Sequence, residues 1–263
     1  MRVVGIDPMS DRPIYQQVAD LLRERIMSGP LPPHTQLPSE SELIDELGVS
    51  RVSARGAYNV LRAEGLVYSV RGRGTFVQER RPVARVAPSR YRAGRDPDGP
   101  DETAFTRDHQ VDWDDYRLDR TFTEVPATGL VAELFGVDEG TPVLERQFVF
   151  YADDQPKQSS VSYLLADMVR DTPVADPANE PWKGGTIAQL ATLGVEVTAI
   201  DHIVTARMPD PNERRHLHIP DGVPVLCVVR TMLAGEQPVE VNVEIVMPAD
   251  RNELRFRTSE TAT

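Results

Sequence analysis

The sequence predicts an α+β protein of two domains, and three observations lead to this prediction. Residues 10–78 contain three stretches with helical spacing, followed by a short β-type hairpin. Residues 79–110 hold four prolines and lack sustained periodicity. Residues 111–257 carry several runs with strand alternation, joined by turns and a few short helical stretches. Consecutive strands joined by turns predict a mainly antiparallel sheet flanked by helices. We therefore expect an N-terminal helical domain, a linker and a C-terminal α+β domain.

The first helix is expected over residues 13–28. Pro13 suits the first turn of a helix, because its ring fixes the backbone angle and its missing N–H is not needed there. Apolar side chains then recur at helical spacing and form one face that can pack against the rest of the domain. These side chains are Ile14, Val18, Leu21, Leu22 and Ile26.

The second and third helices are expected to start at Ser39 and Ser50. Ser39 forms a capping box with Glu42, in which the two side chains satisfy backbone N–H groups at the helix start. Gly48 ends this helix because glycine adopts the left-handed backbone needed there. Ser50 can cap the next helix, which is expected to run to about Glu64. A β-type run and a glycine-rich tip follow, so the region is predicted to be a winged helix-turn-helix domain.

The charge of the third helix and the hairpin tip favours DNA as the ligand. Residues 50–74 contain five arginines and one acid, a local net charge of +4, whereas the whole chain carries −12. A basic spot on an acidic protein directs polyanions to that spot alone. Arginine also matches the paired acceptors of guanine in the major groove. The candidates are Arg51, Arg55, Tyr58 and, for phosphate, Arg62 on the helix, with Arg71 and Arg73 in the tip.

Residues 10–78 resemble the DNA-binding domain of GntR-type bacterial transcription regulators. The resemblance covers nearly all of this region. The motifs that carry it are Pro13-Ile14-Tyr15, Leu37-Pro38-Ser39-Glu40, Glu46-Leu47-Gly48-Val49-Ser50-Arg51, Arg55, Glu64-Gly65-Leu66 and Gly72-Arg73-Gly74-Thr75-Phe76-Val77.

This resemblance implies that the first turn of the third helix reads or grips an operator and that Gly72 enters the minor groove at the wing tip. One departure from the family concerns Ser41, which stands where an arginine commonly follows the Pro-Ser-Glu triplet. A contact usual in the family is thus left open. The residues implied in DNA binding are Ser39, Ser41, Ser50, Arg51, Ser53, Arg55 and Gly72.

The first half of the predicted linker is strongly basic. Residues 79–95 carry six arginines against one acid, so we expect either a plain solvated linker or a basic tether that follows the DNA backbone.

The single Cys227 excludes an internal disulfide and suits a reducing compartment. No apolar stretch approaches the roughly 18 residues that span a bilayer. We expect a soluble cytoplasmic protein without a membrane partner.

The C-terminal domain should contain at least five strands and three helices. Strands are expected over residues 142–151, 157–165, 196–208, 223–234 and 238–247. Helices are expected over residues 130–135, 186–193 and 211–217, with the last two covering one side of the sheet.

The layout of this half resembles the UTRA effector domain of the HutC subfamily over about residues 105–257. The resemblance implies a chorismate-lyase-like sheet, a homodimer, and a small-molecule pocket whose occupancy moves the DNA-binding domains. The motifs that carry it are Leu144-Glu145-Arg146, Ala152-Asp153-Asp154-Gln155-Pro156, Ser162-Tyr163-Leu164, residues 186–194, residues 213–217, Pro224-Val225-Leu226, Pro238-Val239-Glu240 and Pro248-Ala249-Asp250-Arg251.

Candidate effector contacts follow partly from physical arguments. Gly184-Gly185-Thr186 precedes a helix, so it forms either an anion site or an ordinary loop. Arg146 either closes on a carboxylate or phosphate or lies at the surface. Phe148 and Phe150 occupy positions where sugar-phosphate-binding relatives tend to have arginines, which implies a less charged or more aromatic effector. Other strand side chains that could line a pocket, or simply a solvated face, are Tyr163, Glu240, Asn242 and Glu244.

Enzyme chemistry lacks support in the sequence. The five histidines are dispersed, and no zinc, nucleophile or nucleotide-binding motif occurs. We therefore expect no catalytic residue, metal or cofactor. The sequence predicts a ligand-responsive, sequence-specific DNA-binding regulator, a homodimeric repressor released from a palindromic operator by a small-molecule effector. The alternatives are an architectural DNA-binding protein without an effector and an enzyme of chorismate-lyase-like fold.

Overall fold

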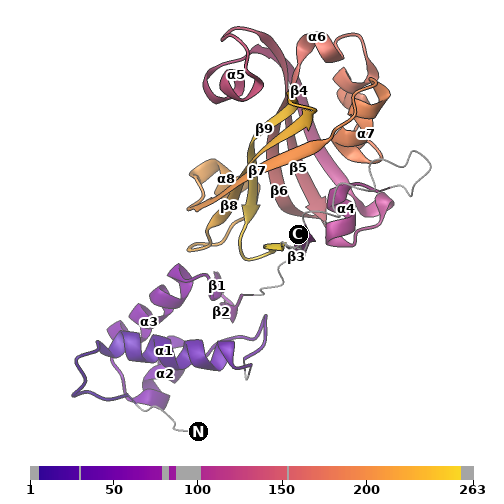
Figure 1. The fold of residues 1–263 in the computed structure, drawn as a ribbon. Coiled ribbons are helices and arrows are strands. Elements are labelled where there is room, and N and C mark those ends of the chain that lie inside the picture. The colour runs from indigo at the N-terminus through magenta and orange to yellow at the C-terminus, as the bar shows by residue number, and fades with distance from the viewer. Residues whose placement is uncertain (1–5, 30, 79–82, 87–101, 153, 256–263) are drawn as a thin grey trace, which may run out of the picture. The chain divides into compact units, whose positions relative to one another are not determined.

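The computed structural model describes residues 6–29, 31–78, 83–86, 102–152 and 154–255. The chain divides into two compact units, whose principal segments lie within residues 6–78 and 83–255 (Figure 1). Each unit is a separate fold with its own apolar core.

The N-terminal unit is the predicted winged helix-turn-helix. Three helices are followed by a two-stranded antiparallel sheet, in which Val67 pairs with Val77 and Val70 pairs with Gly74. The predicted helix starts and stops are confirmed to within one or two residues. The elements are α1 (Ile14–Met27), α2 (Glu40–Leu47), α3 (Arg51–Ala63), β1 (Val67–Val70) and β2 (Gly74–Val77).

The caps of this unit are those that the sequence predicted. The Ser39 hydroxyl accepts a hydrogen bond from the backbone N–H of Glu42, whose carboxylate accepts one from the N–H of Ser39. Gly48 has a φ of 66° and ends α2. The Ser50 hydroxyl accepts from the N–H of Ser53 at the start of α3. These local interactions fix the start and the end of α2 and the start of α3.

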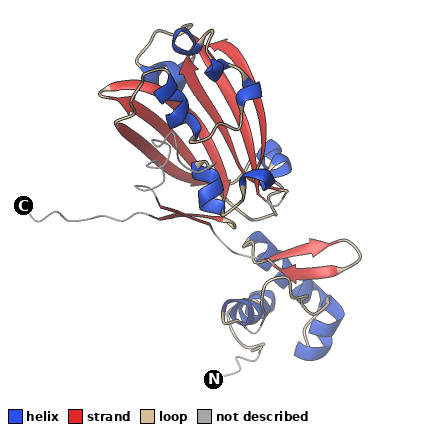
Figure 2. Ribbon diagram, turned by 90° about the vertical axis from the view of Figure 1, so that its right-hand side faces the viewer, coloured by secondary structure: helices blue, strands red, loops and turns tan. Residues whose placement is uncertain are grey.

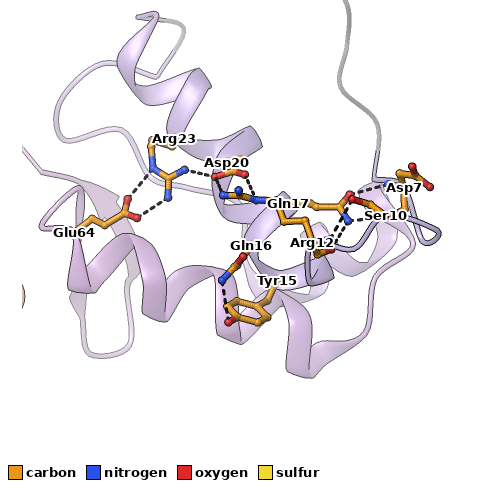
Figure 3. Close-up of polar contacts among 9 residues, drawn as sticks. All are labelled: Asp7, Ser10, Arg12, Tyr15, Gln16, Gln17, Asp20, Arg23 and Glu64. Carbon is orange, nitrogen blue, oxygen red and sulfur yellow. Dashed lines mark hydrogen bonds and ion pairs between the residues drawn. The ribbon is translucent and has the colours of Figure 1, made fainter.

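Helix α1 crosses α3 and is joined to it by packing and by charge. The guanidinium of Arg23 donates to both carboxylate oxygens of Glu64, at 2.8 and 2.5 Å, and also contacts Asp20 (Figure 3). At the other end of the crossing, a Cβ added to Gly56 would lie 3.0 Å from the Cβ of Tyr15. Glycine therefore permits the close approach of the two helices.

The C-terminal unit is built on one six-stranded sheet in which every neighbouring pair is antiparallel (Figure 2). In spatial order the strands are β4 (Arg117–Pro126), β5 (Pro142–Ala152), β6 (Gln155–Leu165), β9 (Gln237–Pro248), β8 (Val225–Ala234) and β7 (Ala199–Arg207). Strand β4 was not predicted, because charged residues interrupt the apolar ones in its sequence RLDRTFTEVP and most of its residues are exposed.

Helices pack against both faces of this sheet. The sequence analysis assigned a side only to the helices over residues 186–193 and 211–217, which it placed on the same face. On one face, Ile187 and Leu190 of the helix after Gly184 pack with Met232. On the opposite face, Phe135 packs with Val143. Both faces are partly apolar, since alternate residues of β5 and β9 point to opposite sides. The helices are α4 (Ala104–His109), α5 (Gly129–Phe135), α6 (Ala166–Val169), α7 (Gly185–Thr192) and α8 (Pro211–His216), with short 3-10 turns at Trp113–Asp115, Pro173–Ala175 and Pro177–Asn179.

The predicted linker, residues 79–110, falls largely outside the described residues. Two described parts of it form regular structure that the sequence analysis did not anticipate. Strand β3 (Val83–Val86) pairs in parallel with β10 (Asn252–Arg255). Helix α4 starts with a capping box between Thr103 and Thr106 and buries Phe105 in the C-terminal unit. A short helix with one aromatic anchor gives little periodic signal, which explains why it was missed.

Candidate nucleic-acid interface and ligand pocket

The first turn of α3 presents polar and basic side chains to solvent. Arg51 and Arg55 are both exposed. The Ser50 and Ser53 hydroxyls lie 3.0 Å apart at the helix start. Arginines projecting from the start of an exposed helix can reach base edges in a major groove, because this end of a recognition helix enters the groove.

Tyr58, predicted to face DNA, is buried with 3% of its surface exposed. It lies on the packing side of α3, and its hydroxyl donates a hydrogen bond to the carbonyl of Pro38. Burial raises the pKa of Tyr58, and Glu42 adds to the shift. Helical spacing placed Tyr58 on the same face as Arg51 and Arg55, but its ring packs in the core. Tyr58 therefore positions α3 against the segment before α2, and it is buried at the edge of the groove described below rather than exposed as the sequence predicted.

Side-chain hydrogen bonds fix the wing to α3 and to the segment before α2. Gln36, just before α2, donates from Nε2 to the carbonyl of Arg73 at 2.9 Å. Arg62 of α3 donates to Oγ of Ser69 in β1 at 3.0 Å. Gly72, with a φ of 75°, turns the exposed tip. The wing tip and α3 thus keep a fixed relation to one another.

A groove runs between α2, α3 and the wing, and it gathers several of the predicted DNA contacts. Ser39 and Arg55 line it, together with Gln36 and Thr75, which the sequence analysis did not single out. Ser41 lies exposed in the first turn of α2. Two arginines, Arg55 and Arg62, line this groove. The other predicted DNA contacts lie outside its lining: Ser41, Ser50, Arg51, Arg71, Gly72 and Arg73 are exposed, and Ser53 is half-buried at the start of α3.

The C-terminal unit contains a cavity of about 110 Å³ between the sheet, α4 and the start of α7. Aromatic rings form one side of it. The ring centroids of Phe105 and Phe150 lie 5.2 Å apart, those of Phe105 and Tyr116 5.6 Å, and those of Phe148 and Phe150 5.8 Å. Trp182 adds a fifth ring to the lining. This wall suits the face of a planar or apolar molecule.

The floor of the cavity is polar and comes from the two central strands, β6 and β9. Gln158, Ser160 and Ser162 follow one another along one face of β6, and Asn242 and Glu240 do so on β9. All five side chains are buried. A few hydroxyl and amide groups in an otherwise aromatic pocket are suited to orienting a small ligand by hydrogen bonds.

Two arginines and two glutamates form a charge-balanced network beside this floor. Arg230 of β8 donates to the carboxylate of Glu240 at 2.6 and 3.2 Å. Arg146 of β5 is fully buried and donates to Oε1 of Gln189 at 2.9 Å, and Gln189 donates to Glu180 at 2.7 Å. Burial lowers the pKa of Arg146, while Glu240 and Glu180 oppose the shift.

One nitrogen of this network makes no hydrogen bond within the described residues. Nη2 of Arg146 has no hydrogen-bond partner among the described residues, and the nearest carboxylate oxygen, on Glu240, lies 3.8 Å away. Arg146 also lies 5.7 Å from the ring centroid of Phe148. It sits behind the cavity floor, since it is absent from the cavity lining while Ser162 and Glu240, which flank it, are present.

The cavity collects five of the eight side chains that the sequence analysis proposed for an effector: Phe148, Phe150, Thr186, Glu240 and Asn242. Tyr163 and Glu244 lie on the opposite face of the sheet, where Tyr163 donates to Glu145 and Glu244 pairs with Arg207. Placing these two in the pocket was wrong. A β-bulge at Val243 interrupts the alternation of β9, so that Glu244 faces away from Asn242.

The start of α7 is less open to an anion than its glycines suggest. Gly184, not Thr186, caps the helix, and it does so with a φ of 77°. Its N–H donates to the carbonyl of Glu102, and that of Gly185 donates to the carbonyl of Trp182. These two donors are used within the protein, so a ligand at this helix start meets only those that follow.

The sequence analysis missed several lining residues because they come from segments without a motif. Phe105 lies on the unpredicted α4, and Glu180 and Trp182 lie between short turns. The alternation of β6 and β8 could have identified Gln158, Ser160 and Arg230, since each shares a face with apolar core residues. Among the described residues, no helix has the length and apolar character needed to cross a membrane. The same residues contain no cluster of three or more His, Cys, Asp or Glu side chains that could hold a metal ion.

Residues 14–77 match the gntR family of bacterial regulatory proteins, and residues 120–252 match the UTRA domain. A histidine utilization repressor of Pseudomonas putida is 32% identical over 94% of this chain and 92% of its own length. An HTH-type transcriptional regulator of Streptomyces coelicolor is 31% identical over 83% of this chain and 82% of its own.

Solved structures agree with these sequence matches. The crystal structure of a GntR-family transcriptional regulator is 31% identical, has a TM-score of 0.66, and is matched over 95% of this chain and 99% of its own. PhnF from Mycobacterium smegmatis, at 19% identity and a TM-score of 0.52 over 93% and 100% of the two chains, shares the fold.

Proposed function

Because this chain belongs to the GntR family of bacterial regulatory proteins, with the UTRA domain of the HutC subfamily, we propose that it is a homodimeric repressor released from DNA by a small molecule. It is a DNA-binding transcription regulator and not an enzyme, as its relatives are transcriptional repressors. We assign DNA binding to residues 10–78, and ligand binding and dimerisation to residues 111–257. Helix α4 joins the second region because it lines the cavity.

The DNA-binding half of the proposal rests on the exposed face of α3 and the wing. Arg51 would read a guanine, Arg55 would bind a base or phosphate, and Gly72 would bring the wing tip into the minor groove. A two-fold symmetric dimer presents two such faces, which predicts an operator made of two inverted half-sites. As bacterial DNA lies in the cytoplasm, the protein would act there.

The cavity is the observation that supports the effector part of the proposal. An architectural DNA-binding protein would need no such site, and this one combines five aromatic rings with a polar, charge-balanced floor. Its two arginines already face carboxylates of the protein. We therefore propose an effector with a planar or apolar body and a few hydrogen-bonding groups, rather than a highly charged sugar phosphate.

A route from the cavity towards the DNA-binding unit starts at α4. Phe105 of α4 belongs to the aromatic wall. The same helix packs against β3, the first described strand after the wing. An effector that moves Phe105 would therefore shift the strand to which the DNA-binding unit is connected in sequence. The effector can change the equilibrium only by its different affinity for the two arrangements of the dimer.

Two measurements on the full chain test this proposal. Selection from random duplex DNA should yield an inverted repeat, and sedimentation should give a dimer on one duplex. A thermal-shift screen of aromatic acids, amino acids including L-histidine, sugar phosphates and apolar signals should find a compound that stabilises the protein and releases that duplex. Histidine is included because two relatives are named as histidine utilization repressors. Turnover of a compound would favour an enzyme, and stabilisation without release would contradict effector control.

A further inference from the structure

Val52 is an apolar side chain displayed to solvent at the start of α3. Its exposed fraction is 82%, and it is the one exposed large hydrophobic residue among the described residues of that helix. The other apolar side chains of α3 serve the core: Ala54, Ala57 and Leu61 are buried, and Val60 packs partly against them. Val52 therefore contributes nothing to the packing of the unit.

Local structure does not explain the residue either. Val52 is the second residue of α3, and the cap of this helix is made by Ser50 and the N–H of Ser53. A β-branched side chain is a weaker helix former than alanine. An apolar group kept in water at a position where it stabilises neither the helix nor the core points to an external contact.

The surroundings of Val52 identify the kind of contact. Arg51 precedes it, and Arg55 lies one turn further along the same side of the helix, both exposed. A basic rim around one small apolar group is suited to a polyanion that displays an isolated methyl group. Duplex DNA has such a group in the major groove, the C5-methyl of thymine, which separates T·A from the other base pairs by apolar contact.

We propose that Val52 contacts the C5-methyl group of one thymine in each operator half-site and so specifies a T·A pair beside the base read by Arg51. This inference rests on the proposal that α3 lies in the major groove. First-turn residues of a recognition helix contact base edges, and Val52 shares that turn with Arg51. Two methyl groups on Cβ give the side chain a fixed apolar end.

The test uses the full chain and the operator obtained by selection. Each thymine of one half-site is replaced in turn by deoxyuridine, which lacks only the methyl group. For the wild type, one replacement should weaken binding about fourfold, the equivalent of about 0.8 kcal/mol for one buried methyl group. For Val52→Ala, that replacement should have no further effect, while the other positions behave as in the wild type.

Matched variants separate this inference from the proposed function. Met27→Ala removes another exposed apolar side chain, on α1, and should keep the wild-type response to deoxyuridine. Arg51→Ala tests whether α3 binds DNA at all. If Arg51→Ala weakens binding but no thymine position responds through Val52, or if the selected half-site has no fixed thymine, the inference about Val52 is wrong and the proposed function stands. If Arg51→Ala binds as well as the wild type, the placement of the first turn of α3 in the major groove is wrong, and the inference about Val52 fails with it.

Discussion

The guanidinium of Arg230 and the carboxylate of Glu240 form a bidentate ion pair inside the cavity of the C-terminal unit, with hydrogen bonds of 2.6 and 3.2 Å. Glu240 is fully buried, and it also lies 3.8 Å from Nη2 of Arg146. One carboxylate of β9 thus faces two arginines, one from β8 and one from β5. The stability of this region and the charge of its cavity depend on the same side chain.

Glu240→Gln should strongly destabilise the C-terminal unit. The substitution removes the buried carboxylate that faces two arginines. Removing one partner of a buried ion pair lowers the free energy of unfolding by about 3–5 kcal/mol. Both tryptophans, Trp113 and Trp182, lie in this unit, so unfolding in urea followed by tryptophan fluorescence reports on it alone. Glu133→Gln, at an exposed position of α5, should leave the transition unchanged. Equal midpoints for the two variants would argue against a structural role for the pair.

Ser160→Leu should block the effector while leaving operator binding intact. Ser160 is buried in the cavity floor, so a larger apolar side chain there takes up ligand space. The variant should bind the selected operator with wild-type affinity but show no thermal shift with the compound that stabilises the wild type. Ser159→Leu is the matched control, because Ser159 is half-buried on the opposite side of the same strand. A normal ligand response from Ser160→Leu would place the effector elsewhere.

Arg51→Ala should reduce operator affinity by about 1–3 kcal/mol, the value of one bidentate contact between an arginine and a guanine. The loss should be greatest for the selected operator and smaller for random DNA, since a base contact carries specificity. Arg117→Ala removes an exposed positive charge from the C-terminal unit and should leave the affinity nearly unchanged. Fluorescence anisotropy at fixed salt concentration measures both. A loss that is the same for every DNA sequence would reassign Arg51 to the phosphate backbone.

Glu42→Gln should weaken α2 at neutral pH but not in acid. The N–H of Ser39 donates to the Glu42 carboxylate and lowers the pKa of that group. A lowered pKa in the folded state gives stability that is present above the unfolded pKa of about 4.3 and is lost as the pH falls through the folded value.

Hydrogen exchange of a peptide that covers α2, compared between the two proteins at the same pH, measures this effect. The wild type should be better protected at pH 7, and the difference should shrink below about pH 4. Asp45→Asn, which changes the same charge outside the cap, should lose no protection. A difference between wild type and Glu42→Gln that is independent of pH would contradict the role of the ionised carboxylate.

The N-terminal unit could be predicted almost entirely from the sequence, because its signals are local. Ser39 with Glu42, Gly48, and Ser50 are caps whose partners lie within three or four residues, and they appear as expected. The orientation of Tyr58 was the exception. Its direction depends on the carbonyl of Pro38, twenty residues away, and no local pattern encodes that hydrogen bond.

The cavity was only partly predictable, because its walls come from segments far apart in the sequence. Strand alternation found Glu240 and Asn242, but the bulge at Val243 turned Glu244 to the other face. Phe105 and Trp182 lie in stretches with no periodic pattern. The sequence left Arg146 as either an effector contact or a surface arginine. Only the positions of Gln189 and Ser162 explain how its charged side chain is held in the interior.

The parallel pair of β3 and β10 has a consequence for how the regulator can be cut or extended. Strand β10, residues 252–255, comes after every other described element, yet it holds β3, which begins six residues after the wing strand ends at Val77. The first and the last described strands of the C-terminal unit are therefore hydrogen-bonded to each other. A tag or truncation near residue 252 would disturb the strand that leads to the DNA-binding unit, so reporters of operator release are better attached at the opposite end of the chain.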